Sequence, residues 1–254
     1  YDLHERIGSG ASSTVHRATR RLDGVCVAVK VVRPGGDEAL SDARDEVVIH
    51  SNLDHEHIVR LLDAFDDQGT LYLVMELCEG GEIFEALVSG DSYDEADAVA
   101  VLRKMLEALA YLASKGVAHR DVKLENVLLK SRGGRTDVVL ADLGIARRFP
   151  TRDRSFAGSP YYVSPEVVLG GAFCAKTDVW SLGVTAYALL TGTMPFHAES
   201  ALSLNRRICE QPVDFDRPQW ASVSAAGRAF VARMLTRDVG RRPGAAALLG
   251  DPWI

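Results

Sequence analysis

Residues 117–129 form the stretch that most constrains this chain, because polar side chains lie there between two apolar ends. Both ends predict short buried β segments that fix the loop between them. Within the loop, Asp121 can accept a hydroxyl proton and Lys123 can neutralise a developing phosphate charge. Asn126 can offer an amide oxygen to Mg²⁺. The pattern therefore predicts a held loop that carries phosphate chemistry.

The composition is that of a globular chain. Its 254 residues, 47% of them hydrophobic, suffice for one large or two small domains with their own cores. The 29 basic and 35 acidic residues give a formal net charge of −6, which disfavours nucleic acid as a partner. No apolar run reaches the roughly 18 residues of a membrane span, and no signal peptide or initiator Met opens the chain. We expect no membrane span and a domain taken from a longer protein.

The cysteines indicate a reducing environment. They are far apart and include no Cys-x-x-Cys pair, so the sequence suggests neither a zinc site nor a disulfide framework. A cytoplasmic or nuclear location fits best. The four positions are Cys26, Cys78, Cys174 and Cys209.

A glycine-containing loop lies near the start of the chain. Gly8 and Gly10 stand between two strand-like runs, where glycine lets backbone N–H groups approach a phosphate closely. An ordinary hairpin turn is the alternative interpretation of this pair. The loop alone does not decide between them.

A lysine interrupts the next apolar run. Lys30 lies within residues 27–32, a strongly β-prone segment in which an unpaired charge is costly. We expect an anionic partner, although a solvent-facing lysine on an edge strand is the alternative. The following helix, expected at about residues 39–52, carries Glu46 and His50 on one face at i, i+4 spacing.

The second half of the chain predicts helices and one further acidic site. Ser92 and Glu95 form a capping-box pattern before a long helix that Gly116 can end. A later strand ends at Asp142, an acid that can chelate Mg²⁺. The apolar run at residues 179–190 predicts a buried central helix.

Together these motifs resemble those of eukaryotic protein kinases. The resemblance covers essentially the whole chain, and its closing segments at 194–196, 225–235 and 251–254 are similar to the calcium/calmodulin-dependent kinase group, including plant-type calcium-dependent kinases. The residues that carry it, in the family's order and spacing, are Lys30, Glu46, Asp121, Asn126, Asp142 and Asp178.

The resemblance implies an α+β, bilobal protein-kinase fold. A small, mainly antiparallel β lobe with one key helix would occupy residues 1–75 and a hinge residues 76–81. A larger, mainly α-helical lobe would occupy residues 82–254. Asp178 would cap the backbone of the turn at His119 and Arg120.

It also implies ATP and Mg²⁺ as cofactors. Lys30 would bridge the ATP phosphates and Glu46, Met75 would guard the pocket behind the adenine, and Asn126 and Asp142 would hold the metal. The residues implied to contact ATP are Ile7, Gly8, Ser9, Gly10, Ala11, Ser12, Ser13, Thr14, Val15, Ala28, Lys30, Glu76, Cys78 and Glu82.

Residues 147–166 resemble an activation segment. Ser155 stands where related kinases carry an activating phosphate, which Arg120 and Arg147 could receive, and an ordinary solvated serine is the alternative. The resemblance implies that Ser159 lies near enough to hydrogen-bond both Asp121 and Lys123. Glu166 would form a buried ion pair with Arg242.

The resemblance implies phosphorylation of serine or threonine in protein substrates. Glu82 and Glu125 would bind a basic residue three positions before the acceptor, although Glu82 could instead hold the ATP ribose. Ile145 goes with threonine preference in the family. A regulatory partner or segment would lie outside this chain.

Two other classes of function were weighed. A pseudokinase that binds nucleotide or a partner without catalysis is the main alternative, motivated by departures from the family pattern at Ser13, His50, Leu143 and Ser164. We expect His50 to be a buried structural histidine. A dinucleotide-binding oxidoreductase needs a third glycine opening a helix, and a Walker-type NTPase needs Gly-Lys-Ser or Gly-Lys-Thr. The sequence has neither.

Overall fold

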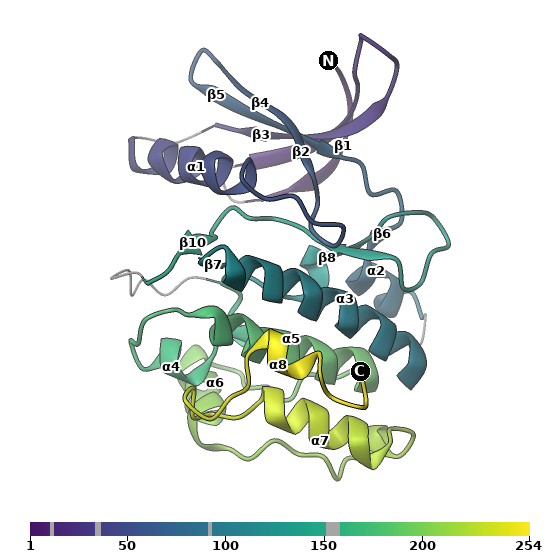
Figure 1. Ribbon diagram of the computed structural model, residues 1–254, viewed down its shortest axis with the longest axis vertical. Coiled ribbons are helices and arrows are strands. Elements are labelled where there is room, and N and C mark those ends of the chain that lie inside the picture. Colours follow the sequence, from purple (N-terminus) through teal and green to yellow (C-terminus); the bar gives the residue numbers. More distant parts are fainter. Residues whose placement is uncertain (11–12, 34–36, 91–92, 151–157) are drawn as a thin grey trace.

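The computed structural model describes residues 1–10, 13–33, 37–90, 93–150 and 158–254. They form two lobes, the first rich in strands and the second in helices (Figure 1). This confirms the predicted bilobal α+β fold.

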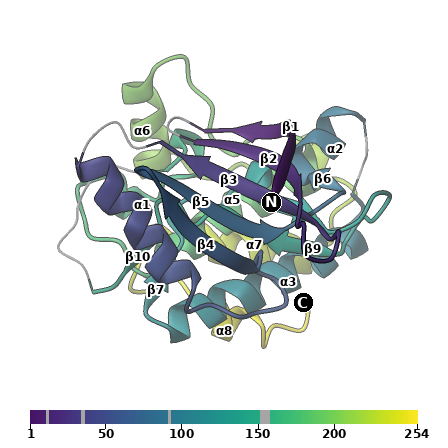
Figure 2. The same ribbon diagram turned by 90° about the horizontal axis from the view of Figure 1, so that it is seen from above.

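The smaller lobe is a five-stranded antiparallel sheet with the strand order β1-β2-β3-β5-β4. Helix α1 (Asp37–His50) runs along one side of this sheet, as the view from above shows (Figure 2). The strands are β1 (Asp2–Ser9), β2 (Ser13–Thr19), β3 (Cys26–Val32), β4 (Leu61–Asp67) and β5 (Thr70–Glu76).

The alternation along β3 decides where its lysine points. Val27, Val29 and Val31 are buried in one apolar cluster of the sheet. Because side chains alternate between the faces of a strand, Lys30 and Val32 belong to the other face. Val32 packs there in a cluster that includes side chains of α1. Lys30 therefore points toward α1 and not toward solvent.

The larger lobe is built around α3 (Glu95–Ser114) and α5 (Ala175–Thr191), which pack against each other. All residues from 177 to 190 are buried, so the prediction of a central buried helix is confirmed. The other helices are α2 (Ile83–Val88), α4 (Pro165–Val168), α6 (Ala201–Glu210), α7 (Ala225–Met234) and α8 (Ala245–Leu248).

Short strands and turns frame the region between the lobes. One sheet joins β6 (Gly81–Glu82), β8 (Val127–Leu129) and β9 (Val138–Leu140), and another joins β7 (Val117–Ala118) to β10 (Arg147–Arg148). The 3₁₀ turns are η1 (Leu124–Asn126), η2 (Pro160–Tyr162) and η3 (Pro218–Trp220).

The start of α3 differs from the prediction. The N-cap is Asp94, whose side chain accepts a hydrogen bond from the Asp97 backbone N–H at 2.8 Å. Glu95 instead accepts from Ser224 N at 2.8 Å and from Trp253 Nε1 at 2.6 Å, tying α3 to the end of the chain. Ser92, the other member of the predicted capping box, lies outside the described residues, and the N-cap of α3 is Asp94 and not Ser92 as the prediction requires. Gly116, with φ of +67°, follows the end of this helix as predicted.

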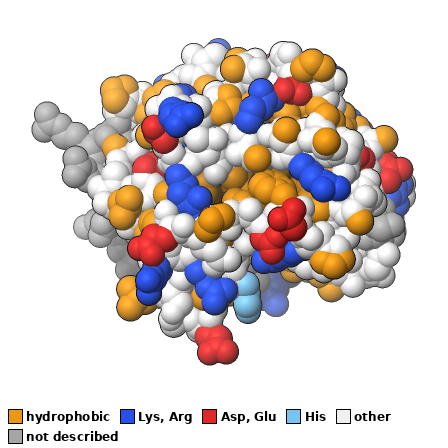
Figure 3. Space-filling model, turned by 90° about the horizontal axis from the view of Figure 1, so that it is seen from below, with side chains coloured by type: hydrophobic (Ala, Val, Ile, Leu, Met, Phe, Trp, Pro, Cys, Tyr) orange, Lys and Arg blue, Asp and Glu red, His pale blue; other side chains and the backbone are white. Residues whose placement is uncertain are grey.

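The end of the larger lobe that faces away from the sheet carries charges of both signs. Basic and acidic side chains are interspersed there around an apolar centre (Figure 3). None of the helices in the described ranges is long and apolar enough to cross a membrane.

Candidate active site

Two features hold the loop of residues 117–129. Its ends are buried strands, because β7 pairs with β10 and β8 with β9, as predicted. Arg120 has φ of +73°, a left-handed conformation that is strained for a residue with a side chain. The buried Asp178 carboxylate accepts hydrogen bonds from His119 N and Arg120 N, both at 2.8 Å. The predicted capping role of Asp178 is confirmed.

Asp121 lies in a polar cluster with Lys123, Asn126 and Ser159. Its carboxylate is 2.7 Å from Lys123 Nζ and accepts from Asn126 Nδ2 at 3.1 Å. Ser159 Oγ donates to Asp121 Oδ1 at 2.9 Å and accepts from Lys123 Nζ at 2.9 Å. A hydroxyl group therefore fits between the acid and the lysine, which is the position from which a substrate hydroxyl can lose its proton.

Gly158 allows this approach of Ser159 to the loop. Its φ is +100°, and a Cβ added there would lie 2.6 Å from the Arg120 carbonyl oxygen. A side chain at this position would push the segment away from Asp121.

Lys30 links the two lobes electrostatically. Its Nζ is 2.6 Å from Glu46 Oε1 and 3.0 Å from Asp142 Oδ1, so the predicted anionic partner is present. Burial of the ammonium acts to lower the pKa of Lys30, but Asp142 and Glu46 outweigh it and raise that pKa. Burial acts to raise the pKa of Asp142, but Lys30 outweighs it and lowers that pKa. At neutral pH the lysine is therefore a cation and Asp142 an anion.

A cleft of about 430 Å³ between the lobes brings most of the predicted nucleotide contacts together. Ala28 and Leu128 line it from opposite lobes, together with Met75 at the hinge end. Burial raises the pKa of the Cys78 thiol to about 12, so this hinge cysteine is neutral at physiological pH. The predicted residues that line the cleft are Ile7, Gly8, Ser9, Gly10, Ser13, Val15, Ala28, Lys30, Glu46, Glu76, Cys78, Glu82, Glu125, Asn126 and Asp142.

Three predicted ATP contacts are not among these lining residues. Ala11 and Ser12 lie outside the described residues. Thr14 is on the strand β2 between Ser13 and Val15, and its hydroxyl is 3.2 Å from His16 Nε2. Because neighbours on a strand face opposite ways, Thr14 is directed away from the cleft that Val15 lines, and its predicted side-chain contact is not supported.

The structure adds acids that the sequence interpretation missed. Glu85 of α2 lines the cleft together with Glu82, the residue directly before that helix, and the spacing of three residues was a usable signal. Burial, with Glu85 and Glu125 nearby, raises the pKa of Glu82. Three carboxyl groups, those of Glu82, Glu85 and Glu125, therefore line the cleft. Leu128 was also missed, although the alternation with its buried neighbours predicts an opposite-facing side chain.

The departures from the family pattern fill space without displacing the charged groups. Leu143 is 2% exposed and lies in the main apolar core, and Ser164 is fully buried. His50 is 3% exposed, as predicted for a structural histidine, and its Nε2 donates to the Val59 carbonyl at 2.7 Å. Its Nδ1 has no hydrogen-bond partner in the described part of the chain.

We expect His50 to make the protein less stable in acid. Burial lowers its pKa, so the folded state keeps it neutral while the unfolded chain takes up a proton near pH 6.5. The stability it contributes is complete above that pH and falls with further acidification, by at most about 1.4 kcal/mol per pH unit. Denaturant unfolding from pH 8 to 5 would show a smaller acid loss in His50→Leu. His197→Leu, at an exposed histidine, serves as the control and should keep the wild-type profile.

The activation segment is described in part. Ser155 lies outside the described residues. Arg147 Nη2 is 2.6 Å from Asp42 Oδ1, and the Arg120 guanidinium lies 4.1 Å from the centroid of the Phe173 ring. Whether these arginines receive a phosphate stays a prediction.

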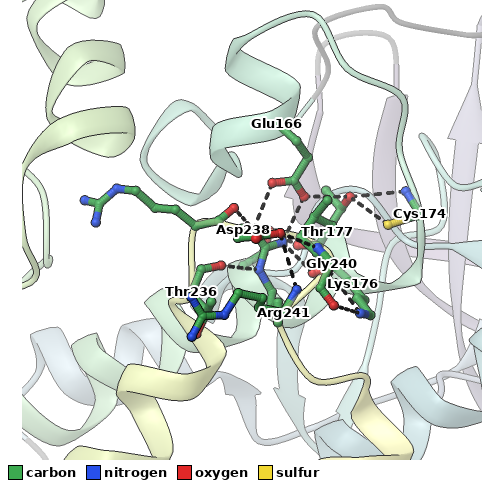
Figure 4. A network of polar contacts seen from close by, with 12 residues as sticks. Glu166, Cys174, Lys176, Thr177, Thr236, Asp238, Gly240 and Arg241 are labelled. Carbon is green, nitrogen blue, oxygen red and sulfur yellow. Dashed lines mark hydrogen bonds and ion pairs between the residues drawn. The ribbon is translucent and has the colours of Figure 1, made fainter.

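The end of this segment is fastened to the core by the predicted ion pair. Arg242 Nη1 and Nη2 donate to Glu166 Oε1 and Oε2, each at 2.8 Å, and the arginine is fully buried. Thr177 Oγ1 donates to the same carboxylate at 3.2 Å, and the contacts around Glu166 form one connected network (Figure 4). The prediction of a buried Glu166–Arg242 pair is confirmed.

Comparison with known proteins agrees with this geometry. The family model described as "Protein kinase domain" matches residues 1–254. The chain is 34% identical over 258 residues to myosin light chain kinase A of Dictyostelium discoideum, covering 100% of this chain and 88% of that protein. It is also 34% identical over 258 residues to serine/threonine-protein kinase H1 of Homo sapiens, covering 100% of this chain and 61% of the relative.

A third relative is calcium/calmodulin-dependent protein kinase type 1 of Macrobrachium nipponense, 35% identical over 257 residues, with 100% of this chain and 74% of the relative covered. The matches span every motif from the glycine loop to the buried arginine. The chain belongs to the protein kinase family, as a serine/threonine kinase domain of the calcium/calmodulin-dependent kinase group.

Proposed function

We propose that this domain transfers the γ-phosphate of ATP to serine or threonine hydroxyls in proteins that carry a basic residue three positions before the acceptor. One observation supports the reaction: Ser159 Oγ bridges Asp121 and Lys123, so a hydroxyl fits between a carboxylate and an ammonium group. The expected result is transfer of labelled phosphate from ATP to a serine peptide. No transfer to any serine or threonine peptide would contradict the proposal.

The side chains divide the work of the reaction. Asp121 accepts the proton of the attacking hydroxyl as the hydroxyl oxygen bonds to the γ-phosphorus of ATP. The bond from that phosphorus to the bridging oxygen breaks and ADP leaves, while Lys123 stabilises the charge on the transferred group. From the other lobe, Lys30 neutralises the phosphates while Glu46 fixes its position. The main contributions of the protein to the reaction are therefore to position the reactants and to stabilise charge.

Asp142 and Asn126 fit a bound Mg²⁺. The Asp142 carboxylate is ionised and its side chain is 50% exposed toward the cleft. Asn126 Nδ2 donates to the Asp121 carbonyl at 2.7 Å, which leaves Oδ1 as the amide atom for a cation. In the described ranges no three His, Cys, Asp or Glu residues could hold a metal alone, as expected where phosphates and water complete the shell. When bound, Mg²⁺ would neutralise phosphate charge.

Nucleotide binding is therefore expected to depend on metal. Calorimetry should show much weaker ATP binding in EDTA than in Mg²⁺, and Asp142→Ala should remove most of that difference. Asp137→Ala, at an exposed acid whose ion pair with Lys104 lies outside the cleft, is the matched control and should behave as wild type. Equal binding with and without EDTA would show that these oxygens do not hold a metal.

Nothing in the described part of the site favours the pseudokinase alternative. Ser13, His50, Leu143 and Ser164 depart from the family pattern, yet Lys30 remains paired on both sides. The charged groups that position and neutralise phosphate are all in place. The relatives reported above are named as kinases.

Substrate choice is expected to follow the acids at the mouth of the cleft. Glu82 and Glu125 both line it, with Glu85 beside them. Replacing arginine by alanine three positions before the acceptor should lower kcat/KM roughly tenfold to a hundredfold, because a hydrogen bond to a charged group contributes about 1.5–3 kcal/mol. Glu82→Ala with Glu125→Ala should remove this preference.

Two readouts separate substrate binding from ribose binding at Glu82. If the acids bind the peptide, the double variant raises the KM for the arginine peptide and leaves the KM for ATP unchanged. Glu210→Ala, which removes an exposed carboxylate paired with Arg206 on α6, is the control for loss of an acid outside the cleft. A rise in the KM for ATP alone would assign Glu82 to the nucleotide.

A further inference from the structure

Helix α1 carries two acids one turn apart that engage different lobes. Glu46 pairs with Lys30 in the sheet lobe at 2.6 Å. Asp42, four residues earlier and therefore on the same side of the helix, pairs with Arg147 at 2.6 Å between Oδ1 and Nη2. Arg147 belongs to β10, which lies beside α1 but is part of the helical lobe (Figures 1 and 2).

Arg147 is itself fixed relative to the catalytic loop. In the β10–β7 pair, Arg147 is the partner of Ala118, the residue directly before the turn at His119 and Arg120. Arg147 Nη1 also donates to the Ala146 carbonyl at 2.9 Å, and its side chain is only 22% exposed. The position of Asp42, which binds the Arg147 guanidinium, is therefore fixed relative to the loop that carries Asp121.

The other described charges of α1 do not make this connection. Arg44 pairs with Asp66 of β4 at 3.7 Å, within the sheet lobe. Asp45 is exposed. Asp42 thus supplies an ion pair between α1 and the helical lobe. Glu46, four residues later on the same helix, pairs with Lys30.

We propose that Asp42 is a positioning residue for phosphate transfer. Through Arg147 it holds α1 against the catalytic loop, which keeps Glu46 on Lys30 and Lys30 near Asp142. The proposal rests on phosphate transfer being the reaction of this site. A carboxylate of the chain itself thereby supplies a negative charge at Arg147, so this contact forms without any modification of the activation segment.

The expected effect is modest and depends on salt. The Asp42 side chain is 55% exposed, and exposed ion pairs shift an equilibrium by roughly two- to fivefold. In phosphatase-treated full-length chain at low salt, Asp42→Asn should lower kcat by that factor while the peptide KM stays constant, because the acids that bind peptide do not touch α1. The difference should shrink at high salt, where the pair is screened.

A double-variant cycle tests the pair directly. Asp42→Asn and Arg147→Gln should each lower kcat, and the double variant should be no worse than either single one. Asp45→Asn makes the same charge change on the same helix without the pair, and should match wild type. Hydrogen exchange of the α1 amides, a readout independent of catalysis, should be faster in both single variants than in Asp45→Asn.

Several results would overturn the proposal. Additive losses in the double variant would mean that the two residues act separately, as would equal losses in Asp45→Asn. A lower melting temperature with unchanged kcat and unchanged α1 exchange would assign Asp42 to stability alone. If the wild type transferred no phosphate, the proposed function would fail, and the exchange experiment would still decide whether the pair holds α1.

Discussion

Asp121→Asn is expected to remove nearly all phosphate transfer and to leave nucleotide binding intact. The carboxylate accepts hydrogen bonds from Ser159 and Asn126 and faces Lys123 at 2.7 Å. An amide cannot take the proton of the attacking hydroxyl, and general-base catalysis contributes about 10²–10⁴-fold to rate. We therefore expect kcat to fall by roughly that factor, measured as labelled phosphate transferred to a serine peptide.

Two controls separate lost chemistry from a damaged site. Calorimetry of ATP with Mg²⁺ should give wild-type affinity, because Asp121 is absent from the residues that line the nucleotide cleft. Asp137→Asn, an exposed acid paired with Lys104, should keep full activity. If Asp121→Asn retained more than a tenth of wild-type kcat while binding ATP normally, another group would have to be the base.

The sequence predicted those parts of the site that depend on local pattern. An apolar strand carrying one lysine predicts a buried cation, and period-two alternation explains why Lys30 faces α1. An all-apolar run predicts the buried α5. In each case the burial of a side chain follows from the pattern of a few neighbouring residues, so the local sequence is enough to predict it.

Contacts between distant segments could not be predicted in the same way. A pattern gives the face on which Asp42 lies, but not that Arg147, 105 residues later, meets it. Glu95 is a second example. Its position in the sequence fits a capping box, but its carboxylate accepts hydrogen bonds from Ser224 and Trp253, which lie far along the chain. Which partner a surface acid finds depends on how the elements pack, and that is a property of the whole fold.

Backbone strain at the site is a second feature that local rules miss. Arg120 and Asp142 have φ of +73° and +60°, values at which sequence rules favour glycine. Such conformations cost about 1–3 kcal/mol each and persist where surrounding contacts fix them. Asp178 supplies two hydrogen bonds at the first turn, and Gly144 N donates to Asp142 Oδ1 at 3.2 Å at the second. Of these two strained residues, Asp142 lines the cleft, and Arg120 directly precedes Asp121.

The largest loss of stability is expected from Arg242→Met. The fully buried arginine forms two 2.8 Å hydrogen bonds with Glu166 and also donates to the Thr236 and Lys176 carbonyls at 2.8 Å. Removing it leaves these two carbonyls without their donor and the buried Glu166 carboxylate without its counter-ion, although Thr177 still donates to it at 3.2 Å. Breaking a buried pair costs about 3–5 kcal/mol. At about 2–4 °C per kcal/mol for a chain of this size, the melting temperature should fall by roughly 6–20 °C.

A second variant distinguishes the lost pair from lost packing. The double variant Glu166→Leu with Arg242→Met also removes the unpaired Glu166 carboxylate, so it should be more stable than Arg242→Met alone. It should remain less stable than wild type, because the Thr236 and Lys176 carbonyls still lack their donor. Arg206→Met, which breaks the exposed pair with Glu210, should change the unfolding free energy by less than about 1 kcal/mol.

The pH dependence provides an independent check on the same pair. Burial acts to raise the pKa of Glu166, but its hydrogen bonds with Arg242 outweigh this and lower it. A depressed carboxylate pKa contributes stability that is complete above the ordinary glutamate value, about pH 4.3, and is lost as pH falls through the folded-state pKa. The double variant should lack this part of the acid loss. If Arg242→Met were as stable as Arg206→Met, or if the double variant kept the wild-type acid profile, the buried pair would not be what fastens the activation segment to α5.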